Sequence, residues 1–182
     1  MIVMLNGYPG VGKLTIAQEL APLIGGRMLD IHTIYNVAFA LTEFKSPEFI
    51  KAVEDVEAIA YDLVRKLPAN VPVVMTTVLA GRSEWGDAEW ERLLALGHDR
   101  PPFCMVHLSC ALDENIRRIQ SDGRGAKRKP RDAEMARRNQ SEAKPLLGGD
   151  VEQFLALDVT TLDPLEAATK IADWLKGVRP TA

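Results

Sequence analysis

The feature that most constrains the fold is a glycine-rich segment between a short apolar run and a helical pattern. Its residues are Gly7, Tyr8, Pro9, Gly10, Val11, Gly12, Lys13, Leu14 and Thr15. This spacing of glycines and lysine is typical of a loop that wraps backbone N–H groups around an anion, with the lysine and a helix N-terminus directed inward. Residues 2–5 precede it as a buried strand, and a helical stripe follows to residue 24. A glycine-rich turn with a chance lysine would not require both flanking elements, so we predict a phosphate-binding loop.

One position departs from the common form of this loop. Leu14 follows the lysine where a serine or threonine usually holds magnesium, and Thr15 comes one position later. The pattern Gly-x-Pro-Gly-x-Gly-Lys-x-Thr resembles the loop of adenylate kinases and, more loosely, those of shikimate kinase and chloramphenicol phosphotransferase. The resemblance implies that ATP is the phosphoryl donor and that Lys13 is catalytic. It also implies a Mg2+ ion near Thr15, held partly through water and by carboxylates elsewhere.

Apolar runs and helical patterns alternate along the rest of the chain. Strands are expected near residues 27–30, 71–78, 103–108 and 154–159, and helices near 34–41, 46–67, 85–97, 112–120, from about 132 and from 163. Five buried strands that alternate with helices predict a three-layer α/β/α fold of the P-loop NTPase type with a parallel sheet, and ligands then belong at the carboxyl ends of the strands. We expect a single kinase-like domain over residues 1–182.

Composition limits the classes of function. The net charge of −3 argues against general binding of nucleic acid, and no apolar run is long enough to span a membrane. The chain begins directly with a strand and shows no leader pattern, so a cytoplasmic location is expected. Cys104 and Cys110 lack the spacing of a zinc site and are expected to be reduced. A GTPase is disfavoured because no Asn-Lys-x-Asp motif occurs, and an AAA+ machine because no room remains for its helical lid domain.

Asp30 stands at the carboxyl end of the second predicted strand, which is the acceptor side in small kinases. The resemblance to shikimate kinase implies that Asp30 acts near the magnesium ion or as a base for the acceptor hydroxyl. His32 stands where those enzymes often have a second aspartate. Asp30 could instead cap the following helix, and His32 is more readily explained as a surface or capping residue. At the end of the third strand, where P-loop enzymes often carry an aspartate, this chain has Thr76 and Thr77.

A basic segment forms the second informative stretch. Residues 117–138 carry nine Lys and Arg against three Asp and Glu, and residues 121–132 show no hydrophobic periodicity. We predict a mobile lid over about residues 121–132 that closes over the phosphates. The likeness to adenylate kinase implies that Arg118 stacks on the adenine and that Arg124 reaches a phosphate. The alternatives are a solvated basic face or an RNA-binding patch, although no aromatic residue is interleaved there.

Together these observations predict an ATP-dependent kinase that phosphorylates a hydroxyl of a small molecule. A nucleoside-monophosphate kinase is the first alternative, but between Asp30 and Asn70 the only arginine is Arg65, whereas an acceptor phosphate requires arginines. Tyr35 and Phe39 could form walls for an apolar acceptor body. The second alternative is a nucleotide-binding protein or slow ATPase that acts through a partner.

Overall fold

The computed structural model describes residues 1–121, 132–142 and 144–178. Five strands form one sheet, and every pairing within it is parallel. The strands are β1 (Ile2–Asn6), β2 (Arg27–Leu29), β3 (Val73–Thr77), β4 (Phe103–Ser109) and β5 (Gln153–Asp158), and their order in the sheet is β2-β3-β1-β4-β5. The predicted fold class is therefore confirmed, because this order is typical of P-loop kinases. The central position of β1 places the glycine-rich segment in the middle of the carboxyl edge of the sheet.

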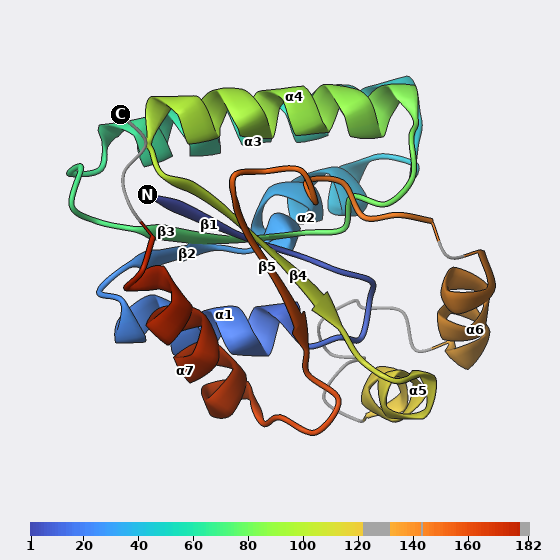
Figure 1. Ribbon diagram of the computed structural model, residues 1–182. Helices are drawn as coiled ribbons and strands as arrows, with labels where there is room; N and C mark the ends of the chain where they lie inside the picture. Colours follow the sequence, from blue (N-terminus) through green and yellow to red (C-terminus); the bar gives the residue numbers. More distant parts are fainter. Residues whose placement is uncertain (122–131, 143, 179–182) are drawn as a thin grey trace.

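Helices cover both faces of the sheet (Figure 1). The described helices are α1 (Lys13–Leu23), α2 (Ile31–Leu41), α3 (Pro47–Lys66), α4 (Glu84–Asp99), α5 (Leu112–Gln120), α6 (Ala133–Glu142) and α7 (Pro164–Leu175). α1 and α7 lie on one face and α3 and α4 on the other, while α5 and α6 lie beyond one end of the sheet. Within the part of the chain that the structure describes, no helix combines the length and hydrophobicity needed to cross a membrane.

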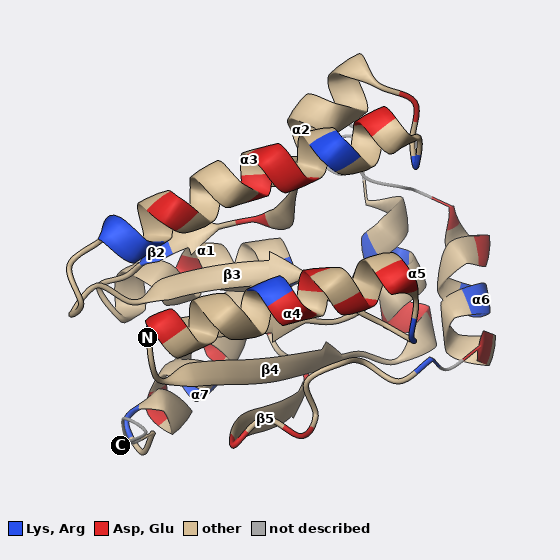
Figure 2. Cartoon of the chain, turned by 90° about the horizontal axis from the view of Figure 1, so that it is seen from above, with Lys and Arg blue, Asp and Glu red and all other residues tan. Residues whose placement is uncertain are grey.

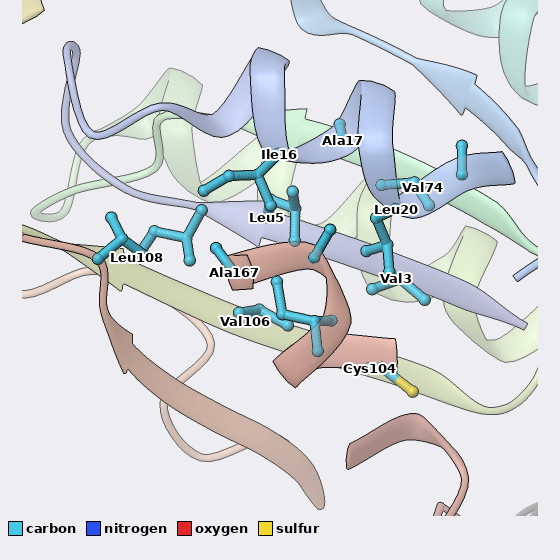
Figure 3. Packing of buried hydrophobic residues seen from close by; sticks show 14 of the residues in the cluster. Val3, Leu5, Ile16, Ala17, Leu20, Val74, Cys104, Val106, Leu108 and Ala167 are labelled. Carbon is cyan, nitrogen blue, oxygen red and sulfur yellow. The ribbon is translucent and has the colours of Figure 1, made fainter. Parts of the chain in front are cut away.

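The core consists of two apolar layers, one on each face of the sheet. On the first face, Ile16 and Leu20 of α1 pack against Val3 and Leu5 of β1 and against residues of α7 (Figure 3). The opposite layer joins Met4 of β1 to α2, α3 and α4. Since β1 is buried along its whole length on both faces, its residues form the continuous apolar run that central parallel strands require.

Several predicted helix ends are confirmed. Ser46 caps α3 through a bond from the Phe49 N–H, and Asp163 forms a capping box with Glu166 at α7. The helix predicted near residues 85–97 is present as α4, and it continues two residues past Gly97 to Asp99. A side chain at Gly97 would lie 2.6 Å from the Phe103 ring, so this glycine permits close packing of the helix on β4 rather than ending the helix.

Candidate functional site

The predicted phosphate-binding loop connects β1 to α1 at the centre of the sheet edge. Gly10 and Gly12 have positive φ angles of 95° and 102°, a conformation that side-chain-bearing residues rarely adopt. Gly12 is the N-cap of α1, and the first turn of this helix carries no acidic residue. The positive end of the α1 dipole therefore remains available for an anion.

Lys13 and Thr15 lie in the first turn of α1, and both side chains contact the loop backbone. The Lys13 ammonium donates hydrogen bonds to the carbonyl oxygens of Gly7 and Tyr8, the second at 3.2 Å. The Thr15 hydroxyl donates to the carbonyl oxygen of Gly12 at 2.8 Å. The lysine charge is thus held at the loop itself, where an anion can replace the carbonyl groups as its partner.

Two asparagines that the sequence interpretation missed fix the strand end before the loop and the loop itself. Asn6, fully buried at the end of β1, donates to the carbonyl oxygens of Leu79 and Leu147 and accepts from the Leu79 N–H. Asn115 of α5 donates to the carbonyl oxygen of Pro9 at 3.1 Å. A polar residue at the end of a buried strand was the available signal for Asn6. For Asn115 the sequence offered none, because the contact spans 106 residues.

Arg118 of α5 lies directly beside the loop. Its guanidinium donates to the carbonyl oxygens of Val11 at 3.0 Å and Val159 at 2.7 Å, and it forms an ion pair with Glu114. Arg117 and Arg118 together hold the pKa of Glu114 well below its ordinary value through hydrogen bonds and charge. A guanidinium whose N–H groups are engaged in its own plane can still stack through its face, so the stacking on adenine stays a prediction.

An open groove adjoins this arginine and the start of α1. Its volume is about 500 Å3, which lies in the range of small-molecule sites. The residues that line it are Gly12, Thr15, Ile16, Glu114, Arg117, Arg118, Thr160, Thr161, Leu162, Asp163 and Pro164. The groove therefore lies between the phosphate-binding loop and the segment that joins β5 to α7.

Asp30 lies at the carboxyl end of β2 and is buried. It occupies the N-cap position of α2, yet its side chain makes no capping hydrogen bond. Instead, Oδ1 accepts a 2.5 Å hydrogen bond from the Thr76 hydroxyl of β3. The capping alternative is thus not supported. His32 lies partly buried in the first turn of α2.

The end of β3 carries no carboxylate of its own, as the sequence indicated, but a glutamate reaches it from α4. The Thr77 hydroxyl donates to Oε1 of Glu89 at 3.2 Å, and the Tyr35 hydroxyl of α2 donates to Oε2 at 3.0 Å. Burial raises the pKa of Glu89 above its ordinary value, and the nearby charge of Glu57 adds to this effect, while the bonds from Tyr35 and Thr77 oppose it.

Glu57 of α3 forms the second half of this buried polar cluster. It accepts a 2.9 Å bond from Arg92 and hydrogen-bonds the Tyr61 hydroxyl. Sequence reasoning missed both glutamates. The available signal was an acid on an apolar helical stripe, because Glu57 lies between Val53 and Tyr61 at intervals of four residues.

Part of the predicted site lies outside the described residues. Residues 122–131, which include Arg124 and most of the predicted lid, are not described. Among residues 1–121, 132–142 and 144–178, no group of three or more His, Cys, Asp and Glu side chains could hold a metal ion. A magnesium ion at this site would therefore depend on water and on the phosphates of its ligand, which is the common mode for this ion.

Comparison with protein families decides where the chain belongs. A family model described as an AAA domain, built on the P-loop, matches residues 3–144. The chain belongs to this family. The matched residues of this AAA-domain family member include the glycine-rich loop, Asp30 and Arg118. An AAA+ machine would carry a further helical lid domain, and the match to residues 3–144 does not test whether that domain is absent. Among curated proteins, no significant match is found.

Solved structures of similar fold include several kinases, all at low sequence identity. The tunicamycin resistance protein of Deinococcus radiodurans superposes with a TM-score of 0.62 at 19% identity, over 100% of this chain and 98% of that protein. Shikimate kinase from Bacteroides thetaiotaomicron gives 0.59 at 13% identity, over 97% and 98%. A sugar kinase from Janibacter sp. HTCC2649 gives 0.58 at 19% identity, over 96% and 94%. These likenesses establish a shared fold.

Proposed function

We propose that this protein is an ATP-dependent kinase that transfers the γ-phosphoryl group to a hydroxyl of a small molecule. One observation carries the proposal. The phosphate-binding loop follows β1 and the Asp30 carboxylate follows β2, so that only β3 separates them at the carboxyl edge of the sheet. An anion site and a buried carboxylate at the same edge of the sheet, one strand apart, are the two parts that phosphoryl transfer to a hydroxyl requires.

The donor side is assigned to the loop and the adjoining groove. The loop backbone, Lys13 and the α1 N-terminus would bind the phosphates of ATP, and the groove beside Arg118 would take its base. Thr15 would hold Mg2+ together with water and phosphate oxygens, and Asp30 would lie near the ion, at its water shell, because its two oxygens are assigned to Thr76 and to the acceptor. The metal would supply neutralisation of the phosphate charge. Arg124 keeps its predicted role at a phosphate.

The acceptor side is assigned to the region around Asp30, α2 and α3. Its described residues offer little to bind a second phosphate, because Arg65 pairs with Asp99 and Arg92 pairs with Glu57. An uncharged hydroxyl therefore fits this side better than a nucleoside monophosphate. Tyr35 contacts Phe39, with ring centroids 6.1 Å apart, and both remain candidates for walls around an apolar body.

The proposed step needs one base. The acceptor oxygen forms a bond to the γ-phosphorus as the bond from that phosphorus to the β–γ bridging oxygen breaks, and ADP leaves with the electron pair. The hydroxyl proton passes to Asp30 and then to solvent. The bond from Thr76 orients the carboxylate through Oδ1, and Oδ2 is the oxygen that we assign to the acceptor.

A protein that binds nucleotide and hydrolyses it slowly is the second candidate. The absence of a carboxylate on β3 itself favours it, because Thr76 and Thr77 bring no negative charge to the strand end. Such a protein would act through a partner and would need no proton acceptor beside the loop.

The variant Asp30→Asn tests the proposed base. Asparagine retains an oxygen that accepts the Thr76 bond, so the change removes charge and basicity with little change in shape. We expect kcat to fall by about 10²- to 10⁴-fold, the usual contribution of a general base, while ATP affinity stays within a few-fold. Steady-state kinetics and calorimetric titration measure the two quantities. Asp62→Asn, an exposed change on α3, is the control, and an unchanged kcat in Asp30→Asn would contradict the assignment.

A further inference from the structure

A small cavity lies on the proposed acceptor side, between the sheet and helices α2, α3 and α4. Its volume is about 10 Å3, which is close to the minimum that admits one water-sized group. Besides apolar side chains, it is lined by Tyr35, Glu57, Tyr61, Thr76, Thr77 and Glu89. A group of this size matches the head of a protonated amine as well as a water molecule.

The cavity lies next to the carboxylate that the proposed function assigns as the base. Thr76 lines the cavity and donates to Oδ1 of Asp30, and Ile31, which also lines it, is the next residue in the chain. A substituent in the cavity would thus be carried by a part of the acceptor close to the reacting hydroxyl.

The cavity wall is rich in hydrogen-bond acceptors. The hydroxyl hydrogens of Tyr35 and Thr77 are donated to Glu89, and that of Thr76 is donated to Asp30. Each of these hydroxyls can now offer only lone pairs. Three buried side-chain N–H groups have no partner among the described residues, and they belong to Trp85, Arg92 and Arg100, which do not line the cavity. A ligand group in this cavity must therefore donate hydrogen bonds.

The charge around the cavity is negative. Glu57 and Glu89 are buried, with 4% and 9% of their surface exposed, and among the described residues the ion pair of this cluster joins Arg92 to Glu57. Over their full lengths α3 and α4 carry ten Asp and Glu against four Lys and Arg, and acidic residues occur along both helices (Figure 2). The surrounding field would attract a cation and repel an anion.

We propose that the acceptor carries a protonated amine near its reacting hydroxyl and that Glu89 selects for this amine. The inference rests on the proposed function and narrows its substrate class to amino alcohols. The ammonium group occupies the cavity and donates to Glu89 and to hydroxyl oxygens of the wall, while the hydroxyl lies at Asp30. An anionic acceptor would be repelled by the two buried carboxylates, and a neutral acceptor would leave their excess negative charge unpaired.

Sets of probes that differ only in charge test the inference. One set is 2-amino-1-phenylethanol, 1-phenylethane-1,2-diol and mandelate, and a second set is glucosamine, glucose and glucuronate. Each probe is titrated into the protein by calorimetry, with and without ADP. We expect the amine of at least one set to bind about tenfold or more tightly than its neutral and anionic counterparts. Equal binding within both sets, preference for a neutral or anionic probe, or no binding of either amine overturns the inference.

Two variants assign the preference to one carboxylate. Glu89→Gln should bind the amine and the neutral probe equally, whereas Glu91→Gln, an exposed change on the same helix, should keep the preference. A preference retained in Glu89→Gln overturns the role of this residue. Thermal unfolding shows whether Glu89→Gln is folded, and if it is not, the ranking of probes by the native protein decides. Failure of ADP to bind would refute the proposed function, whereas binding of ADP with preference for neutral probes would refute only this inference.

Discussion

The contact between the phosphate-binding loop and α5 can be tested by replacing Gly10 with alanine. Two costs apply at this position. The φ angle of 95° strains any residue with a Cβ atom, which costs about 1–2 kcal/mol. The new Cβ would also lie 2.6 Å from Nδ2 of Asn115 and 2.7 Å from Cγ1 of Ile119, and overpacking of this kind costs about 1–3 kcal/mol. The free energy of unfolding should therefore fall by about 2–5 kcal/mol in total.

Gly25→Ala is the matched control, because it carries the strain without the collision. Gly25 has a φ of 65°, and nothing lies within 4 Å of the position of its Cβ. Both variants restrict the unfolded chain equally, so this term cancels between them. The Gly10→Ala protein should unfold about 2–12 °C below Gly25→Ala, taking about 2–4 °C for each kcal/mol in a chain of this size.

Thermal unfolding followed by circular dichroism measures this difference, and calorimetric titration measures ATP affinity. We expect Gly10→Ala to lose affinity for ATP, because the loop must move away from α5 to fit the new methyl group. Gly25→Ala, at the far end of α1, should bind ATP as the native protein does. Equal melting temperatures and equal affinities for the two variants would refute the packing argument.

Two further predictions concern charged groups. Lys13→Ala should abolish measurable ATP binding in calorimetric titration, while the melting temperature changes little. Lys51→Ala, which changes an exposed side chain on α3, is the control. Full affinity for ATP in Lys13→Ala would contradict the assignment of the loop. The raised pKa of Glu89 predicts that its contribution to stability is fully present below its ordinary value of 4.5 and is lost as pH rises through the folded value. The groups that face the Glu89 carboxylate are Tyr35, Glu57 and Arg92. In urea unfolding, the free energy of unfolding of Glu89→Gln should therefore increase relative to that of the native protein as pH rises above 4.5, by up to about 1.4 kcal/mol per pH unit. A constant difference between the two proteins across pH would show that Glu89 titrates normally.

The fold was predictable from the sequence because its strands are buried on both faces. A strand such as β1, with five buried residues, produces an unbroken apolar run, and the phosphate-binding loop fixes its place at the centre of the sheet. The role of Gly97, which lies near the end of α4 as predicted, could not be derived from the sequence, because a glycine that ends a helix and a glycine that admits a neighbouring ring look the same there. Only the position of Phe103, on the next strand, distinguishes them.

The candidate site was predictable only where it is local in sequence. The loop and Asp30 each follow a recognisable strand, so their places at the carboxyl edge of the sheet could be predicted before the structure was known. The partners of Asp30 and Glu89 could not, because the bond from Thr76 spans 46 residues and that from Tyr35 spans 54. The sequence suggested an absent carboxylate at the end of β3, whereas the chain brings Glu89 there from a helix.

The central claim is that the γ-phosphoryl group of ATP passes to an acceptor hydroxyl. Phosphorus NMR of the products, after incubation of the protein with ATP, Mg2+ and pools of hydroxyl-bearing metabolites, tests it most directly. The pools include amino alcohols, sugars and the nucleoside monophosphates AMP, CMP, GMP and UMP. We predict a new phosphate-ester signal that forms in step with ADP and is absent with Lys13→Ala. A signal of inorganic phosphate alone would support the slow ATPase instead, and a nucleoside diphosphate formed from a monophosphate would contradict the hydroxyl acceptor.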